Sequence, residues 1–199
     1  MKSNVCKIEN GIKDLEAILK ESEKVAVYNE LTHKQALQLR LICEEIDGML
    51  PKIVDGFDGD LWIEFENGVC KVNVSIAFDH ITGSKREELI KVAKNQKNAA
   101  AVGIVGKIRA AIENFFLDEE NICALESSAD MFHMATGFSD GVDYSYLWSL
   151  EQYRSNVAKG DKPENQDELE KSVIASVADD VVIGIKGKQA DIVITKRFA

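Results

Sequence analysis

The chain has 199 residues and carries 24 basic against 34 acidic side chains, a net charge of −10, with 45% apolar residues. This length and composition predict one folded domain over residues 1–199 and exclude a disordered chain, and the acidic balance argues against nucleic acid or an anionic membrane surface as a partner. Because the amino terminus has no signal-peptide core and the longest apolar window falls far short of the roughly 20 residues that span a bilayer, we expect a cytoplasmic protein.

Two amphipathic helices are predicted at the start of the chain. Apolar residues recur at helical spacing over Ile8–Tyr28. A second helix is expected to begin after Thr32, which can act as its N-cap, with Gln35 at the capping-box position. Its apolar stripe runs to Leu50, and Pro51 predicts the end of the helix because the residue before a proline avoids the helical region.

A loop over Asp55–Asp60, marked by its glycines, is expected to precede a β-hairpin. The predicted strands Leu61–Glu66 and Val69–Phe78 flank Asn67-Gly68, a dipeptide typical of two-residue type I′ turns. In the second strand apolar residues alternate with more polar ones. This alternation predicts a sheet that is covered on one side.

The second half of the chain predicts further helices and a closing hairpin. Helices are expected over Lys85–Val92, Ala99–Phe116, Tyr144–Val157, and from Asp167 or Glu168 to Ala178, whereas Asp118–Asp143 has no clear pattern. The closing hairpin consists of Val181–Ile185 and Ala190–Phe198 around a turn at Gly187-Lys188. The order of these elements predicts an α+β two-layer sandwich, a mixed β-sheet with helices on one face.

The basic excess of the chain lies in Lys85–Arg109, which has seven basic residues against two acids. Such a segment in an anionic chain attracts a small anion such as phosphate, although a solvated lysine-rich helix face gives the same pattern. Glycines that open a helix allow close backbone approach and offer free N–H groups to a phosphate, although they also permit close helix packing. The candidate phosphate-binding residues are therefore Lys97, Asn98, Gly103, Gly106 and Lys107.

Two other places carry candidate site residues. Glu44 and Glu45 are adjacent acids on the second helix, where one could polarise a water or hold a metal through water. The alternative is the solvated edge of an amphipathic helix. Asp79 leaves the end of the buried strand toward Gly83, a common position for binding the polar edge of a ligand, although many such Asp residues only make a turn.

The four cysteines form no C-x-x-C pair and have no metal-ligand spacing. Three of them lie in apolar stretches, which predicts small, reduced core residues. The three histidines lie far apart, so no metal site is predicted from them. The cysteines are Cys6, Cys43, Cys70 and Cys123.

The order of these features resembles the ATP-binding fold of the gyrase and histidine-kinase (GHKL) superfamily, in particular its anti-sigma-factor serine kinases and histidine-kinase-type ATPase domains. Leu39–Glu45 is similar to the family's first motif helix, and Val74–Asp79 is similar to the strand that leads to its adenine-binding Asp. Gly103–Ile108 resembles its second glycine box, and Asp191–Phe198 resembles its closing strand. The resemblance covers about Leu31–Phe116 and Asp179–Phe198.

The resemblance implies that Glu44 or Glu45 is the catalytic carboxylate. In the family an Asn four residues after that Glu coordinates the magnesium that bridges the phosphates. Here Gly48 stands four residues after Glu44, and Met49 stands four after Glu45, so neither supplies a metal ligand. Because phosphoryl transfer depends on the metal to neutralise developing charge, the resemblance implies the fold more strongly than the activity and argues against Mg²⁺.

The resemblance also implies a nucleotide, ATP or ADP, on Asp79, Gly83 and the basic glycine segment, although the middle glycine of the family's Asp-x-Gly-x-Gly loop is missing. Three functions stay open. One is a degenerate GHKL-like regulatory protein that binds a nucleotide without efficient catalysis and acts through a protein partner. Another is an interaction module with a vestigial pocket, with Asp118–Asp143 and the acidic last third as its surface. The third is an active ATPase or anti-sigma-type serine kinase. Related kinases often dimerise, which leaves a homodimer open.

Overall fold

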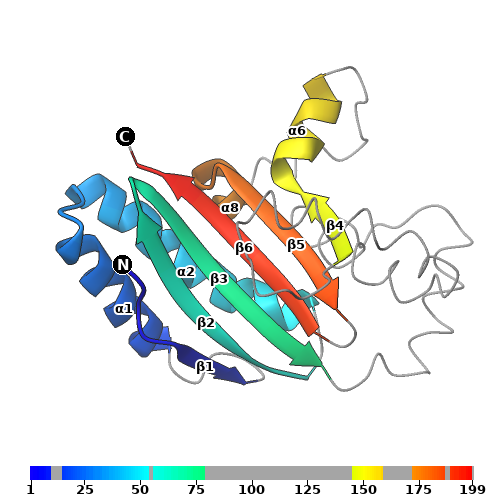
Figure 1. Cartoon of the computed structure of the whole chain (residues 1–199), viewed down its shortest axis with the longest axis horizontal. Coiled ribbons are helices and arrows are strands. Elements are labelled where there is room, and N and C mark those ends of the chain that lie inside the picture. Colours follow the sequence, from blue (N-terminus) through cyan, green and yellow to red (C-terminus); the bar gives the residue numbers. More distant parts are fainter. Residues whose placement is uncertain (10–14, 54–55, 79–144, 159–171, 187–188, 199) are drawn as a thin grey trace, which may run out of the picture.

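The computed structural model of the chain describes residues 1–9, 15–53, 56–78, 145–158, 172–186 and 189–198. Within these residues six strands form one sheet in the order β1-β2-β3-β6-β5-β4, and α1 and α2 lie against one face of it (Figure 1). The predicted α+β class is therefore confirmed. The strands are β1 Cys6–Glu9, β2 Phe57–Glu66, β3 Val69–Phe78, β4 Ser145–Ser149, β5 Asp180–Lys186 and β6 Gln189–Arg197. The helices are α1 Leu15–Tyr28, α2 His33–Ile53, α6 Leu150–Ala158 and α8 Val173–Val177.

Every pair of neighbouring strands in the described sheet is antiparallel, so the predicted mixed sheet is wrong for this part of the chain. The reason is visible at the amino end, where two helices, not one, separate β1 from β2. A single crossover helix brings the chain back parallel to the first strand, whereas a helical hairpin reverses it once more. Antiparallel pairing then follows for β1 and β2.

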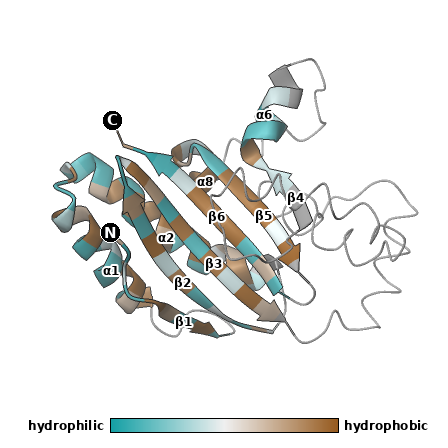
Figure 2. Cartoon of the chain, viewed as in Figure 1, coloured by the Kyte–Doolittle hydropathy of each residue, from teal (hydrophilic) through white to brown (hydrophobic). Residues whose placement is uncertain are grey.

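The hydrophobic core lies between the sheet and the helical layer. Alternate residues of the strands point toward α1 and α2, and Figure 2 shows the resulting alternation of hydrophobic and hydrophilic bands along β2 and β3. Large aliphatic side chains from both helices fill the space, each contributing about 1.5–3 kcal/mol when fully buried. The fully buried ones include Ile18, Leu39, Ile42, Ile46, Leu50, Leu61, Ile63 and Ile76.

The first predicted helix is wrong at its amino end. Ile8 lies in β1, opposite Gly59 of β2, and among the described residues Leu15–Tyr28 of the expected Ile8–Tyr28 is α-helical. A short apolar run does not reveal its own periodicity, so Ile8 matched the helical pattern by chance. Cys6–Glu9 forms a strand because the edge of β2 supplies hydrogen-bond partners to its backbone.

The second helix begins as predicted and ends later. The side chain of Gln35 accepts a hydrogen bond from the Thr32 N–H at 2.8 Å, and the Gln35 N–H donates to Thr32 Oγ1 at 3.4 Å, so the capping box is confirmed. The predicted end at Pro51 is wrong, since α2 continues to Ile53. Leu50 is fully buried in the core, and this packing holds it in the helical region that the following proline disfavours.

The predicted hairpin is confirmed, with Glu66 paired to Val69. Asn67 and Gly68 have φ values of 49° and 77°, which is the backbone of a type I′ turn. The predicted loop over Asp55–Asp60 is wrong from Phe57 onward, because β2 already begins there. A glycine inside this strand marks a close backbone approach rather than a turn.

The predicted helix Tyr144–Val157 is wrong in its first part. Ser145–Ser149 is strand β4, which pairs with β5, and α6 follows from Leu150. Aromatic residues fit a strand as well as a helix, and the open edge of β5 supplies the backbone partners. The helix expected from Asp167 or Glu168 does not run unbroken to Ala178, because Ser172 is an extended N-cap and α8 begins only at Val173.

The closing hairpin is confirmed, because all four of its strand ends lie within one residue of the predicted positions, and β6 lies beside β3 at the centre of the sheet. No helix in the described part of the chain is long and apolar enough to cross a membrane. Four predictions lie outside the described residues: the helices Lys85–Val92 and Ala99–Phe116, the unassigned stretch Asp118–Asp143, and the turn Gly187-Lys188.

Candidate functional site

The predicted site residues divide into two groups. Glu44 and Glu45 lie on α2 and are described by the structure. The residues expected to bind a nucleotide lie outside the described residues, so those assignments stay predictions. They are Asp79, Gly83, Lys97, Asn98, Gly103, Gly106 and Lys107.

Glu44 belongs to a small ion-pair network between the two helices. Its Oε1 accepts a hydrogen bond from Arg40 Nε at 2.9 Å, and Arg40 Nη1 lies 3.1 Å from Glu23 Oε1 on α1. Exposed pairs of this kind contribute little to stability, each about 0.2–1 kcal/mol. Their geometry nevertheless shows that the Arg40 side of α2 faces α1, and that Glu44 is engaged there.

Glu45 lies on a different side of α2. At 100° per residue it stands about 140° around the helix from Arg40, so it faces away from α1. Its side chain is half-buried, and it makes no hydrogen bond or ion pair with any residue that the structure describes. Of the two acids, Glu45 is therefore the one available to meet a ligand.

The second half of α2 lies at the end of the sheet where β3 finishes. Only residues 54–56 separate Ile53 from Phe57, and Phe57 pairs with Phe78, the last residue of β3. The chain therefore leaves β3 at the same end of the sheet at which α2 ends (Figure 1). Two positions that the sequence singled out, the acidic part of α2 and the exit of β3, are brought toward each other by this topology.

The residues of α2 do not fit a magnesium ion. Met49 is 1% exposed and packs in the core, while Gly48 is exposed and carries no side chain. A Cβ atom added to Gly48 would meet no atom within 4 Å. The position therefore has space for a metal-ligating side chain, but glycine does not supply one. Among the described residues no group of three or more His, Cys, Asp or Glu side chains is arranged to hold a metal.

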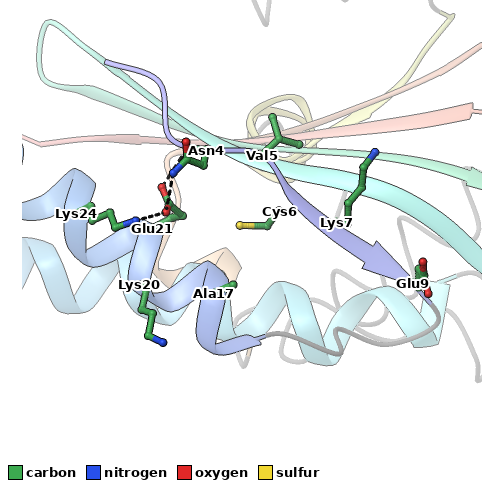
Figure 3. A pocket seen from close by; sticks show the side chains of 9 residues that line it. All are labelled: Asn4, Val5, Cys6, Lys7, Glu9, Ala17, Lys20, Glu21 and Lys24. Carbon is green, nitrogen blue, oxygen red and sulfur yellow. Dashed lines mark hydrogen bonds and ion pairs between the residues drawn. The ribbon is translucent and has the colours of Figure 1, made fainter.

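A groove of about 520 Å³ lies between β1 and α1, and a carboxylate clamp forms one end of its lining (Figure 3). Glu21 accepts hydrogen bonds from the backbone N–H and the side-chain amide of Asn4, both at 3.1 Å, and lies 2.5 Å from Lys24 Nζ. The hydrogen bond from Lys24 is the main reason why the pKa of Glu21 is lowered, against the opposing effect of burial. The clamp therefore ties the amino-terminal segment to α1.

This clamp predicts a pH-dependent contribution to stability. Because the folded-state pKa of Glu21 is lowered from 4.5, its contribution is present above that value and is lost as the pH falls through the folded-state pKa. We expect Glu21→Gln to reduce the free energy of unfolding by about 1.5–3 kcal/mol at pH 7, as for hydrogen bonds to a charged group. Urea titrations at pH 7 and pH 3 measure this, and the difference between the two proteins should shrink at pH 3. A difference that is the same at both values would contradict the assigned role.

The described cysteines are free thiols. Cys43 and Cys70 are buried in the core, where desolvation raises the pKa of both thiols, that of Cys70 to about 12. A thiol with so high a pKa is a poor nucleophile at neutral pH. These two residues confirm the predicted core role, and Cys6 is half-buried in the wall of the groove.

Sequence reasoning missed a polar cluster on the other face of the sheet. Asn73 on β3 is 1% exposed and Asp191 on β6 is 4% exposed, although both lie at strand positions that point away from α1 and α2. Their residue types could have identified this cluster from the sequence, because Asp and Asn are depleted in strands and here they stand among Val and Ile.

Comparisons with models of known protein families, with curated proteins and with solved structures found no match.

Proposed function

We propose that the chain is a GHKL-like regulatory domain that binds an adenine nucleotide and does not turn it over efficiently. The observation that carries the proposal is the position of α2. This helix crosses one face of the sheet and ends where the chain leaves β3 toward Asp79. On the side away from α1 it presents Glu45, which has no partner among the described residues.

The order of the described elements gives further support. A strand, two helices and a hairpin are followed at the end of the chain by a second hairpin, and β6 of that hairpin pairs with β3 along its length. The predicted adenine-binding strand and the predicted closing strand are thus neighbours at the centre of the sheet. This arrangement agrees with the resemblance stated from the sequence.

The missing metal ligand supports binding without efficient catalysis. Transfer of a phosphoryl group develops charge that a bound cation normally neutralises, and α2 has no oxygen ligand at Gly48 or Met49. A nucleotide held through its base and through backbone N–H groups needs no such ligand. The domain would then respond to the nucleotide and transmit its presence to a protein partner.

One observation favours the alternative of an interaction module. Val27 and Tyr28 at the end of α1 are 80% and 73% exposed, and Leu37 and Leu41 are exposed one turn apart on α2. Exposed apolar side chains that are grouped along neighbouring elements often mark a protein-binding surface. This surface would serve a partner whether or not a nucleotide is bound.

Calorimetric titration with ATP and with ADP tests the proposal. We expect saturable binding that is weakened at least tenfold by Asp79→Asn and by Glu45→Gln. Glu44→Gln is the matched control, because Glu44 is engaged with Arg40 and its loss should leave the affinity unchanged. Binding should persist in EDTA, with no release of phosphate above background. The absence of heat at millimolar nucleotide would remove the nucleotide from the proposal and leave the interaction module.

A further inference from the structure

A row of polar residues crosses the sheet on the face away from α1 and α2. Strand pairing aligns Lys7 of β1 with Asp60 of β2, Asp60 with Ser75 of β3, Ser75 with Asp191 of β6, and Asp191 with Gly184 of β5. Lys7 Nζ lies 2.7 Å from Asp60 Oδ1 at the edge of the sheet. The first carboxylate of the row therefore has a counter-ion, and the second lies at the centre of the sheet.

Asp191 is held from one side only. Its Oδ1 accepts a hydrogen bond from Gln189 Nε2 at 3.4 Å, and the same amide donates to Ser75 Oγ at 2.8 Å. Its Oδ2 is buried and has no hydrogen-bond partner among the described residues. An ionised carboxylate withdrawn from water is unfavourable unless a donor or a cation compensates it.

Asn73 adds a second unsatisfied oxygen beside Asp191. Its Nδ2 donates to the Lys71 carbonyl at 3.4 Å, whereas its Oδ1 is buried without a partner among the described residues. Asn73 pairs with Val193, two residues along β6 from Asp191, so the two side chains are diagonal neighbours on one face. Diagonal neighbours lie about 7–8 Å apart with their Cβ atoms somewhat closer, so that the side-chain oxygens of both residues can reach a shared ligand.

The chemistry of Asp191 Oδ2 and Asn73 Oδ1 defines which kind of group can bind them. A carboxylate oxygen and an amide oxygen are both acceptors, so neither can satisfy the other. Both are hard oxygen ligands of the kind that Mg²⁺, Ca²⁺ and Mn²⁺ prefer. Gly184, opposite Asp191 on β5, leaves the adjoining position without a side chain.

We propose that Asp191 and Asn73 bind one divalent cation on this face of the sheet, with Ser75 Oγ as a neighbouring oxygen. Glu45, the described residue of the proposed nucleotide site, lies on α2, which packs on the opposite face of the sheet. The cation site requires no nucleotide. Its occupant would compensate the buried carboxylate and join β3 to β6.

Calorimetric titration of the EDTA-treated chain with Mg²⁺, Ca²⁺ and Mn²⁺, in the absence of nucleotide, tests the proposal. We expect one cation per chain for at least one of the three, with affinity reduced at least tenfold by Asp191→Asn. Asp60→Asn removes a carboxylate from the same row and is the matched control, since Asp60 is engaged with Lys7 and its loss should leave the affinity unchanged.

Asn73→Asp provides an independent readout that does not depend on the Asp191 variant being folded. It brings two buried carboxylates together, so its melting temperature should fall in EDTA and recover when the cation is added. Wild-type titrations without saturable heat up to millimolar cation would overturn the proposal. The proposal would also be overturned if Asp191→Asn bound the cation with unchanged affinity. The same holds if no cation restored the melting temperature of Asn73→Asp.

Discussion

Gly59→Ala is expected to destabilise the fold by at least about 3 kcal/mol, the upper end of the usual cost of overpacking a core. A Cβ atom at Gly59 would lie 2.2 Å from the Ser75 carbonyl oxygen and 3.0 Å from the Cα of Ile76. Both atoms belong to the backbone of β3, which is hydrogen-bonded to β2 and to β6 and cannot move without disrupting a ladder. The substitution therefore separates β2 from β3 or leaves a severe clash.

Thermal unfolding followed by circular dichroism measures this effect. For a chain of this size a loss of 3 kcal/mol corresponds to a decrease in melting temperature of roughly 6–12 °C. Gly48→Ala is the matched control, because its Cβ would meet no atom within 4 Å in an exposed turn of α2. That variant should gain up to about 1 kcal/mol from the higher helix propensity of alanine. A Gly59→Ala protein as stable as the wild type would show that β2 and β3 are not paired in this register.

Gly48→Asn is expected to make nucleotide binding dependent on magnesium. The new side chain would stand within one helical turn of both Glu44 and Glu45, so its amide oxygen is available whichever acid corresponds to the family's Glu. The space around the position is open, so the substitution should not strain the fold. We expect the affinity for ATP in Mg²⁺ to rise at least tenfold, about 1.4 kcal/mol, over the affinity in EDTA.

Paired calorimetric titrations in Mg²⁺ and in EDTA measure this difference. Gly48→Ala also replaces the glycine but adds no metal ligand, so it should show no dependence on magnesium. If wild-type protein binds ATP while Gly48→Asn shows no such dependence, α2 does not face the phosphates and the proposed role of Glu45 is wrong. Met49→Asn is the less useful variant, because Met49 is buried in the core and a polar side chain there would destabilise the fold.

Much of the local structure followed from residue type and spacing. Thr32 and Gln35 form the capping box that their spacing predicted, and Asn67-Gly68 forms the predicted turn because both residues tolerate positive φ. The alternation along β3 also predicted which of its residues would be buried in the core. Each of these features depends on neighbours within a few positions in the chain, so a single sequence contains the required information.

Other features depended on partners that are distant in the sequence. Ile8 is a strand residue because β2 offers it a free edge, and Gly59 is a strand residue because the backbone of β3 comes too close for a side chain. The same holds for Ser145–Ser149, whose pairing with β5 outweighs a pattern that also fitted a helix. Periodicity cannot report such contacts, since the hydrogen-bond partner is a segment elsewhere in the chain.

For the candidate sites too, some features followed from the sequence and others only from contacts between distant segments. The sequence by itself determined that α2 carries two adjacent acids and that Gly48 and Met49 supply no oxygen ligand. The binding roles assigned to residues from Asp79 to Lys107 stay predictions, because these residues lie outside the described part of the chain. Only the tertiary structure separated Glu44, engaged with Arg40, from Glu45, because the packing of the apolar side of α2 in the core sets how the helix is rotated, and the ion pair from Arg40 to α1 shows that rotation. Only strand register placed Asn73 beside Asp191, since β3 and β6 are far apart in the chain and meet through their backbone hydrogen bonds.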